Sequence, residues 1–196
     1  MASARRLLRP PVLGLAAAFF FPAAAAAQTP TLAERIEACG ACHGVDGNSP
    51  MEKIPSLAGQ PELFIANQLI LMREGVRPVE AMTPFVKDLK DDTVVALARH
   101  YAALQPKPSG EAADPALAAR GAEIGKTKRC DSCHLPTLAG SAQIPRIGKQ
   151  RIDYLIHSLK QFRDSPHPGA DTIMSGAVAG LSDADLAALA HYAAAR

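Results

Sequence analysis

Two pentapeptides decide the fold, Cys39-Gly40-Ala41-Cys42-His43 and, later in the chain, Cys130-Asp131-Ser132-Cys133-His134. Both follow the pattern Cys-x-x-Cys-His, which is the attachment signature of a c-type haem. Two thiols one helical turn apart can reach the vinyl groups on one haem edge, and the next histidine can supply the proximal nitrogen to the iron. The sequence therefore predicts two covalently attached haem c groups, with these residues as binding partners: Cys39, Cys42, His43, Cys130, Cys133 and His134.

Other uses of paired cysteines fit this pattern less well. A four-cysteine zinc site would not need a histidine directly after both pairs. A thioredoxin-like redox pair would need a βαβ context, which the sequence does not indicate. Two simple disulfides are the remaining alternative, and haem attachment is favoured over all three.

The first 27 residues are predicted to be a secretory signal peptide. A basic start is followed by a short apolar run over 12–21, and an alanine run then offers a cleavage site. An uncleaved membrane anchor is the alternative, but the apolar run is short and is followed by Pro22. We expect cleavage near Ala27/Gln28 and a periplasmic mature protein.

The charge balance gives no sign of a nucleic-acid partner. The full chain has 21 basic and 19 acidic side chains, for a formal net charge of +2. Removal of the signal peptide takes away three arginines and no acidic residue, so the balance turns slightly negative. Because no Lys/Arg block with interleaved aromatic residues is present, we predict that the protein does not bind nucleic acid.

A repeat extends well beyond the cysteine pairs and divides the mature chain into two halves. The stretch 55–60, which reads PSLAGQ, corresponds to 145–150, which reads PRIGKQ. Between the halves lies a stretch rich in turn residues. We predict a first domain over 28–104 (half one), a linker over 105–113, and a second domain over 114–196 (half two).

Both halves are predicted to be all-α, with long loops, because apolar residues recur at helical spacing and strand patterns are absent. Each half is small, and the chain has no Trp, so we expect each to need its haem to complete a core. Thr31-Leu32-Ala33-Glu34 matches a capping box that starts a helix running into Cys39. The other predicted helices cover roughly 61–74, 91–104, 115–130, 151–163 and 183–195.

The sixth iron ligands are predicted to be Met82 and Met174. Met174 is the only methionine of half two, and Met82 is its counterpart in the repeat. We expect Met174 in a loop before the last helix, where the chain can fold back over the distal haem face. The rival ligands are His100 and His191, at matched places in the final helix of each half. His/Met ligation would raise the reduction potential relative to bis-histidine ligation.

Other repeated residues suggest supporting roles. The carbonyl of Pro55 or Pro145 could accept a hydrogen bond from the proximal histidine, or each could be a simple turn proline. Arg73 and Arg163 could pair with haem propionates, or lie exposed at helix ends.

The first and last helices of each half are expected to cross. Tyr101 and Tyr192 are interpreted as packing residues at these crossings. Gly121 would permit a close approach in half two, and half one has no glycine at the comparable place. The two crossings are therefore expected to differ.

The chain resembles the dihaem cytochromes of the cytochrome c4 family. Half two departs from the family pattern after its haem motif, where Leu135-Pro136-Thr137 replaces a glycine-containing turn. The resemblance implies two tandem class I cytochrome c-like domains, packed about a pseudo-twofold axis with haem propionates near the interface. In half one, the resemblance is carried by Cys39–Gly44 with Asp46-Gly47-Asn48-Ser49, by 55–60 and by Met82. In half two, it is carried by the second haem motif, 145–150, Phe162-Arg163, Met174 and Leu181-Ser182-Asp183.

The expected function is electron transfer rather than catalysis, because a six-coordinate iron leaves no position open for a substrate. The resemblance implies a periplasmic carrier that shuttles single electrons between a respiratory donor and a terminal oxidase. The expected partners are that oxidase and an upstream cytochrome complex or dehydrogenase, with peripheral membrane association through them. Three alternatives stay open: the cytochrome subunit of a larger dehydrogenase such as a sulfide-oxidising flavocytochrome, a haem enzyme such as a thiosulfate dehydrogenase or peroxidase, and a disulfide-containing structural module.

Overall fold

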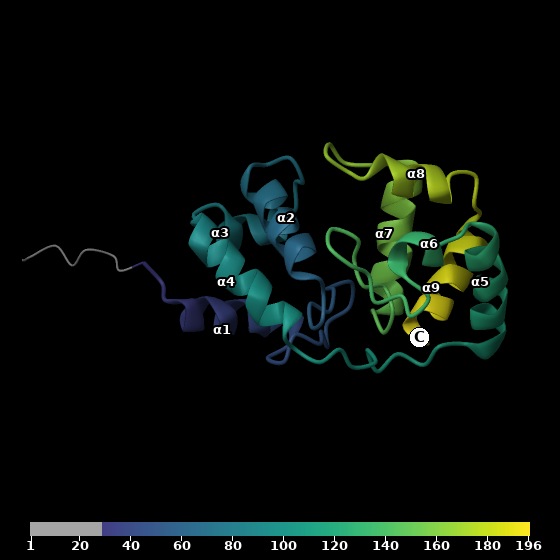
Figure 1. The fold of residues 1–196 in the computed structure, drawn as a ribbon, viewed down its shortest axis with the longest axis horizontal. Helices are drawn as coiled ribbons and strands as arrows, with labels where there is room; N and C mark the ends of the chain where they lie inside the picture. The colour runs from purple at the N-terminus through teal and green to yellow at the C-terminus, as the bar shows by residue number, and fades with distance from the viewer. Residues whose placement is uncertain (1–28) are drawn as a thin grey trace, which may run out of the picture.

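The computed structural model describes residues 29–196, and the predicted signal peptide lies outside them. The described chain forms two helical lobes joined by an extended segment (Figure 1). Within residues 29–196 there is no strand beyond one isolated bridge between Ser141 and Ile144. The all-α fold class is therefore confirmed.

The helices follow the same order in both halves, and the stretch 105–114 between them carries none. Half one contains α1 (Leu32–His43), α2 (Glu62–Arg73), the 3-10 turn η1 (Glu80–Met82), α3 (Thr83–Val86) and α4 (Asp91–Ala102). Half two contains α5 (Pro115–Thr127), α6 (Asp131–His134), α7 (Ile152–Asp164), α8 (Thr172–Val178) and α9 (Asp183–Ala194).

The first helix of each half differs from its prediction. In half one, α1 does not stop at Cys39 but continues through the whole haem motif to His43. In half two, the helix predicted over 115–130 ends at Thr127, and the motif starts a separate short helix, α6. The break follows from Arg129, whose φ of 58° lies in the left-handed region.

Side-chain caps explain where several helices begin. The predicted capping box is confirmed, because the Thr31 side chain accepts from the Glu34 N–H and the Glu34 carboxylate accepts from the Thr31 N–H. A second capping box, between Ser182 and Asp185, starts α9. Asp114 caps α5 by accepting from the next two free N–H groups of that helix.

The core of half two depends on a close crossing of α5 and α9. A Cβ added at Gly121 would collide with the Ala188 carbonyl and would lie 2.7 Å from Tyr192 Cβ. Only a residue without a side chain fits there, so the predicted role of Gly121 is confirmed. In half one, Tyr101 is buried in a cluster with α4 side chains.

Among residues 29–196, no single helix is long and apolar enough to cross a membrane. Helices α8 and α9 would meet the length and composition test only as a pair, and their axes differ by 114° at the break between them.

The two halves meet through matched glutamines. The Gln60 side chain donates to the Arg146 carbonyl at 2.8 Å and accepts from the Arg146 N–H at 2.9 Å. Gln150 makes the same pair of bonds to Ser56, at 2.9 and 2.8 Å. Since Gln60 and Ser56 correspond to Gln150 and Arg146 in the repeat, each half binds the other in the same way. Such reciprocity is the mark of a twofold axis.

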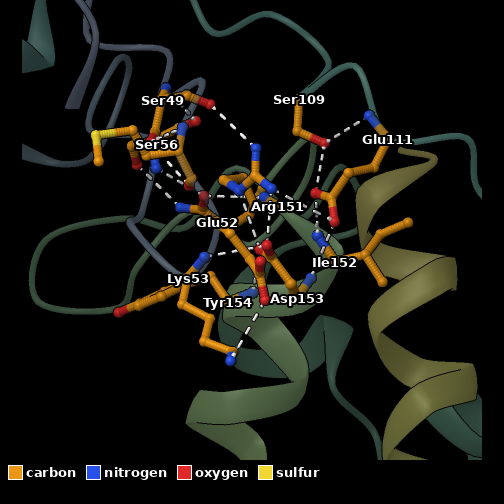
Figure 2. Close-up of polar contacts among 12 residues, drawn as sticks. Ser49, Glu52, Lys53, Ser56, Ser109, Glu111, Arg151, Ile152, Asp153 and Tyr154 are labelled. Carbon is orange, nitrogen blue, oxygen red and sulfur yellow. Dashed lines mark hydrogen bonds and ion pairs between the residues drawn. The ribbon is translucent and has the colours of Figure 1, made fainter. Parts of the chain in front are cut away.

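A charged cluster adds to this interface (Figure 2). The Arg151 guanidinium bonds the Asp153 carboxylate at 2.7 Å and reaches the Ser49 carbonyl of half one at 3.4 Å. The same carboxylate accepts from the Lys53 N–H at 3.0 Å. From the linker, Glu111 accepts from the first N–H groups of α7 at 2.8 and 3.2 Å. This carboxylate caps a helix whose own N-cap residue makes no such bond.

Gly121→Ala should destabilise half two by about 2 kcal/mol, because the added methyl group forces α5 and α9 apart. The measurement is the urea midpoint of the haem-loaded protein, followed by circular dichroism. Gly176→Ala is the control, because Gly176 lies in helix α8 with no atom within 4 Å of an added Cβ, and it should gain about 0.5–1 kcal/mol. An unchanged midpoint for Gly121→Ala would contradict the close crossing.

Candidate haem-binding sites

Half two holds its four predicted site residues around one cavity. The cavity measures about 180 Å³ and is lined by Cys130, Cys133, His134 and Met174. Most of the remaining wall is apolar and comes from α7, α8 and α9. A largely apolar space lined by two thiols, an imidazole and a thioether has the chemistry that a c-type haem requires.

Half one has a larger cavity of about 510 Å³, lined by Cys39 and Met82. Leu69 and Leu97 add apolar wall from α2 and α4. Cys42 and His43, which end the same helix as Cys39, do not line this cavity. The structure therefore brings together two of the four predicted residues here, one from each side of the site.

Both proximal histidines are oriented by a prolyl carbonyl. His43 Nδ1 lies 2.8 Å from the Pro55 oxygen, and His134 Nδ1 lies 2.8 Å from the Pro145 oxygen. A carbonyl can only accept, so Nδ1 carries the proton and Nε2 keeps a free lone pair for a metal. The predicted hydrogen bond from each proximal histidine to a prolyl carbonyl is confirmed, so Pro55 and Pro145 are more than simple turn residues.

The protonation of both imidazoles favours metal binding. Burial lowers the pKa of His43 and of His134 below the ordinary histidine value, although the prolyl carbonyls act in the opposite direction. A neutral imidazole can ligate iron, whereas an imidazolium cannot.

The chain turns sharply after each proximal histidine. Gly44 has a φ of 85°, and a Cβ there would collide with the Asn48 carbonyl. In half two the same place is taken by Leu135, with a φ of 70°. Thus Leu135 keeps the positive φ and extended ψ that Gly44 has in half one, a conformation that costs a residue other than glycine about 1–3 kcal/mol.

The two methionine segments differ from each other and from the predicted loop. Met174 lies within α8 rather than in a loop. Asp171 makes this helix possible, because its side chain accepts from the Ile173 and Met174 N–H groups at 2.8 and 3.2 Å. Met82 ends η1, whose N-cap makes no side-chain hydrogen bond. An aspartate three residues before Met174 was the sequence signal for this cap.

The rival histidine ligands have other surroundings. Neither His100 nor His191 lines either cavity. His191 Nδ1 accepts from the Asp114 N–H at 2.9 Å, where the linker meets half two.

The two repeated arginines form ion pairs with protein carboxylates. Arg73 bonds the Leu89 carbonyl at 2.9 Å and the Asp91 carboxylate at 2.7 Å. Arg163 makes the matching bonds to Leu181 and to an aspartate that begins α9. Each guanidinium ties the end of one helix to the start of another. Because protein carboxylates bind both guanidinium groups, neither arginine is an unpaired helix end, and the propionate pairing stays a prediction.

Each helical half has a Cys-x-x-Cys-His motif beside an apolar cavity, an imidazole oriented by a carbonyl, and a methionine in the cavity wall. A chain with two such halves is a dihaem c-type cytochrome. Residues 118–194 match the family described as "Cytochrome c", and residues 24–100 match "Cytochrome C oxidase, cbb3-type, subunit III". Cytochrome c4 of Pseudomonas aeruginosa is 36% identical over 165 residues, which cover 79% of this chain and 81% of that protein. The chain belongs to the cytochrome c4 family.

Two further comparisons extend this result. The crystal structure of reduced recombinant cytochrome c4 from Pseudomonas stutzeri superposes with a TM-score of 0.74 at 34% identity, and covers 81% of this chain and 93% of that one. A protein named "Thiosulfate dehydrogenase electron acceptor" from Thiomonas intermedia is 33% identical over 205 residues, which cover 98% of this chain and 91% of that protein. The chain is thus an electron-transfer protein with two covalent haem c groups.

Asp171→Ala should loosen α8 and, if Met174 is the predicted iron ligand, make it easier to displace. Loss of an N-cap costs about 1 kcal/mol, so imidazole should bind one haem about fivefold more tightly. Asp171→Asn is the control, because asparagine caps equally well. Optical titration of the oxidised protein with imidazole measures both variants, and equal affinities for alanine and asparagine would contradict this role of the cap.

Proposed function

We propose that this protein is a periplasmic carrier whose two irons are held between His43 and Met82 and between His134 and Met174. Cys39 and Cys42 would form the thioethers of the first haem, and Cys130 and Cys133 those of the second. The observation that carries the proposal is the cavity of half two, which both thiols, the imidazole and the thioether line together. We further propose that the domains span 28–104 and 114–196, joined by 105–113 after cleavage near Ala27/Gln28.

Haem c supplies reversible one-electron Fe(III)/Fe(II) exchange when it is bound. The residues of this chain would keep the surroundings of each iron constant during that exchange. Pro55 and Pro145 fix the imidazole tautomer through their carbonyls, and the apolar cavity walls keep water from the iron. With His43 and Met82 holding one iron and His134 and Met174 the other, neither site would be open to a substrate, so electrons would pass without bond chemistry.

We propose that the electrons come from a respiratory donor and go to a terminal oxidase. The match of residues 24–100 to a subunit of cbb3-type cytochrome c oxidase supports an oxidase as acceptor. Membrane association would then be peripheral and would depend on these partners.

A second candidate function is to accept electrons from a dehydrogenase that oxidises sulfur compounds. The relative named as an electron acceptor of thiosulfate dehydrogenase covers nearly the whole chain, including the linker. In that role the protein would still carry electrons rather than oxidise the sulfur compound itself. A stable subunit of a larger dehydrogenase, such as a sulfide-oxidising flavocytochrome, is the related alternative.

Met174→Ala should abolish the methionine-to-ferric-iron charge-transfer band of one haem and lower its reduction potential, and Met82→Ala should do the same to the other haem. Met51→Ala is the control, because that side chain is exposed at the surface. Spectropotentiometry of the three variants measures both effects. Unchanged potentials in both ligand variants would show that the ligand assignment is wrong.

Stopped-flow kinetics can separate the two roles. The reduced protein is mixed with a terminal oxidase of cbb3 type, and the oxidised protein with a thiosulfate dehydrogenase and its substrate. Fast oxidation in the first experiment and slow reduction in the second support the respiratory role. The opposite pattern would assign the protein to sulfur-compound oxidation.

A further inference from the structure

Arg146 is the point at which the two matched halves differ most. It occupies the place that Ser56 holds in half one, and only 4% of it is exposed. Its Nε donates to the Ala58 carbonyl at 3.1 Å, and its Nη1 donates to the Gly148 carbonyl. Its Nη2 is buried and has no hydrogen-bond partner among residues 29–196.

This guanidinium also lacks a counter-ion. Within the described part of the chain, no carboxylate lies at ion-pair distance from Arg146, whereas the neighbouring Arg151 pairs with Asp153 and Glu111. Burial alone lowers the pKa of Arg146 to about 10, which still leaves the group charged near neutrality. A buried cation without an anion costs several kcal/mol, so the fold is incomplete without a negative group at this point.

We propose that the free Nη2 of Arg146 donates to a propionate carboxylate of a bound haem. Haem c brings carboxylates with it, and a guanidinium is the side chain best suited to bind one in a buried place. Arg146 directly follows Pro145, whose carbonyl holds the His134 imidazole. It directly precedes Ile147, which lines the cavity of half two. The proposal rests on the haem c content of the chain and not on which partners exchange its electrons.

The position of this charge would make the two haems unequal. Ser56 offers no charge at the matching place, so the buried guanidinium without a counter-ion is found in half two and has no counterpart in half one. A fixed positive charge beside a haem stabilises the ferrous state relative to the ferric state. Arg146 would therefore raise the potential of the haem that it contacts, and so help to decide on which haem an electron rests.

The test compares Arg146→Gln with Arg146→Lys, with the two haem potentials measured separately by spectropotentiometry. We expect Arg146→Gln to lower the potential of one haem and Arg146→Lys to restore most of it. The haem whose potential changes is the haem that supplies the propionate. Arg151→Gln is the matched control. It removes a charge from the same interface, but the anions that pair with Arg151 are carboxylates of the protein itself. The proposal would be overturned if both haem potentials were unchanged in Arg146→Gln. It would also be overturned if Arg151→Gln lowered a haem potential by the same amount.

A crystal structure of the haem-loaded wild-type protein decides the matter even if Arg146→Gln does not fold. We expect Nη2 within hydrogen-bond distance of a propionate oxygen. An Nη2 bonded only to water or to a protein carbonyl would refute the contact. The haem content of the same sample separates this failure from a failure of the haem assignment itself.

Discussion

Each half of this cytochrome c4 homologue must fill an apolar cavity that its own side chains leave open, and a covalently held haem fills it. The buried clusters of both halves are small, and the chain has no Trp to enlarge them. The hydrogen bonds from His43 and His134 to prolyl carbonyls then fix where each haem face must lie. A thioether lines each cavity, from Met82 in half one and from Met174 in half two. The haem therefore acts as a structural core as well as the redox centre.

The interface is symmetric in its backbone contacts and asymmetric in its charges. Gln60 and Gln150 each bind the other half through the same pair of hydrogen bonds, so the duplicated segment works as its own partner. Arg146 and Arg151 both come from half two, and the matching places in half one hold the uncharged residues Ser56 and Pro61. Two similar haems in a symmetric frame would have similar potentials, and it is the unequal charges that can separate them.

Much of this could be predicted from the sequence because the signals are local or repeated. The haem motifs, the capping box at Thr31 and the close approach at Gly121 each depend on residue types at fixed spacing. The contacts of Arg73 and Arg163 with the start of the last helix in each half could not be predicted, because Asp91 and Asp183 are brought to them only by the packing of the helices. The helical setting of Met174 was missed because its cap at Asp171 is a single residue in an irregular stretch. The Ser56-to-Arg146 difference was visible in the repeat, but its burial emerged only when the halves were packed together.

The most direct measurement is the number of porphyrins that one mature polypeptide retains covalently. Acid–acetone extraction removes any haem that is not covalently bound, and the alkaline pyridine spectrum then counts what remains against protein concentration. The account predicts two per chain, with the spectrum of haem attached through two thioether bonds. One haem per chain, or none, would contradict it.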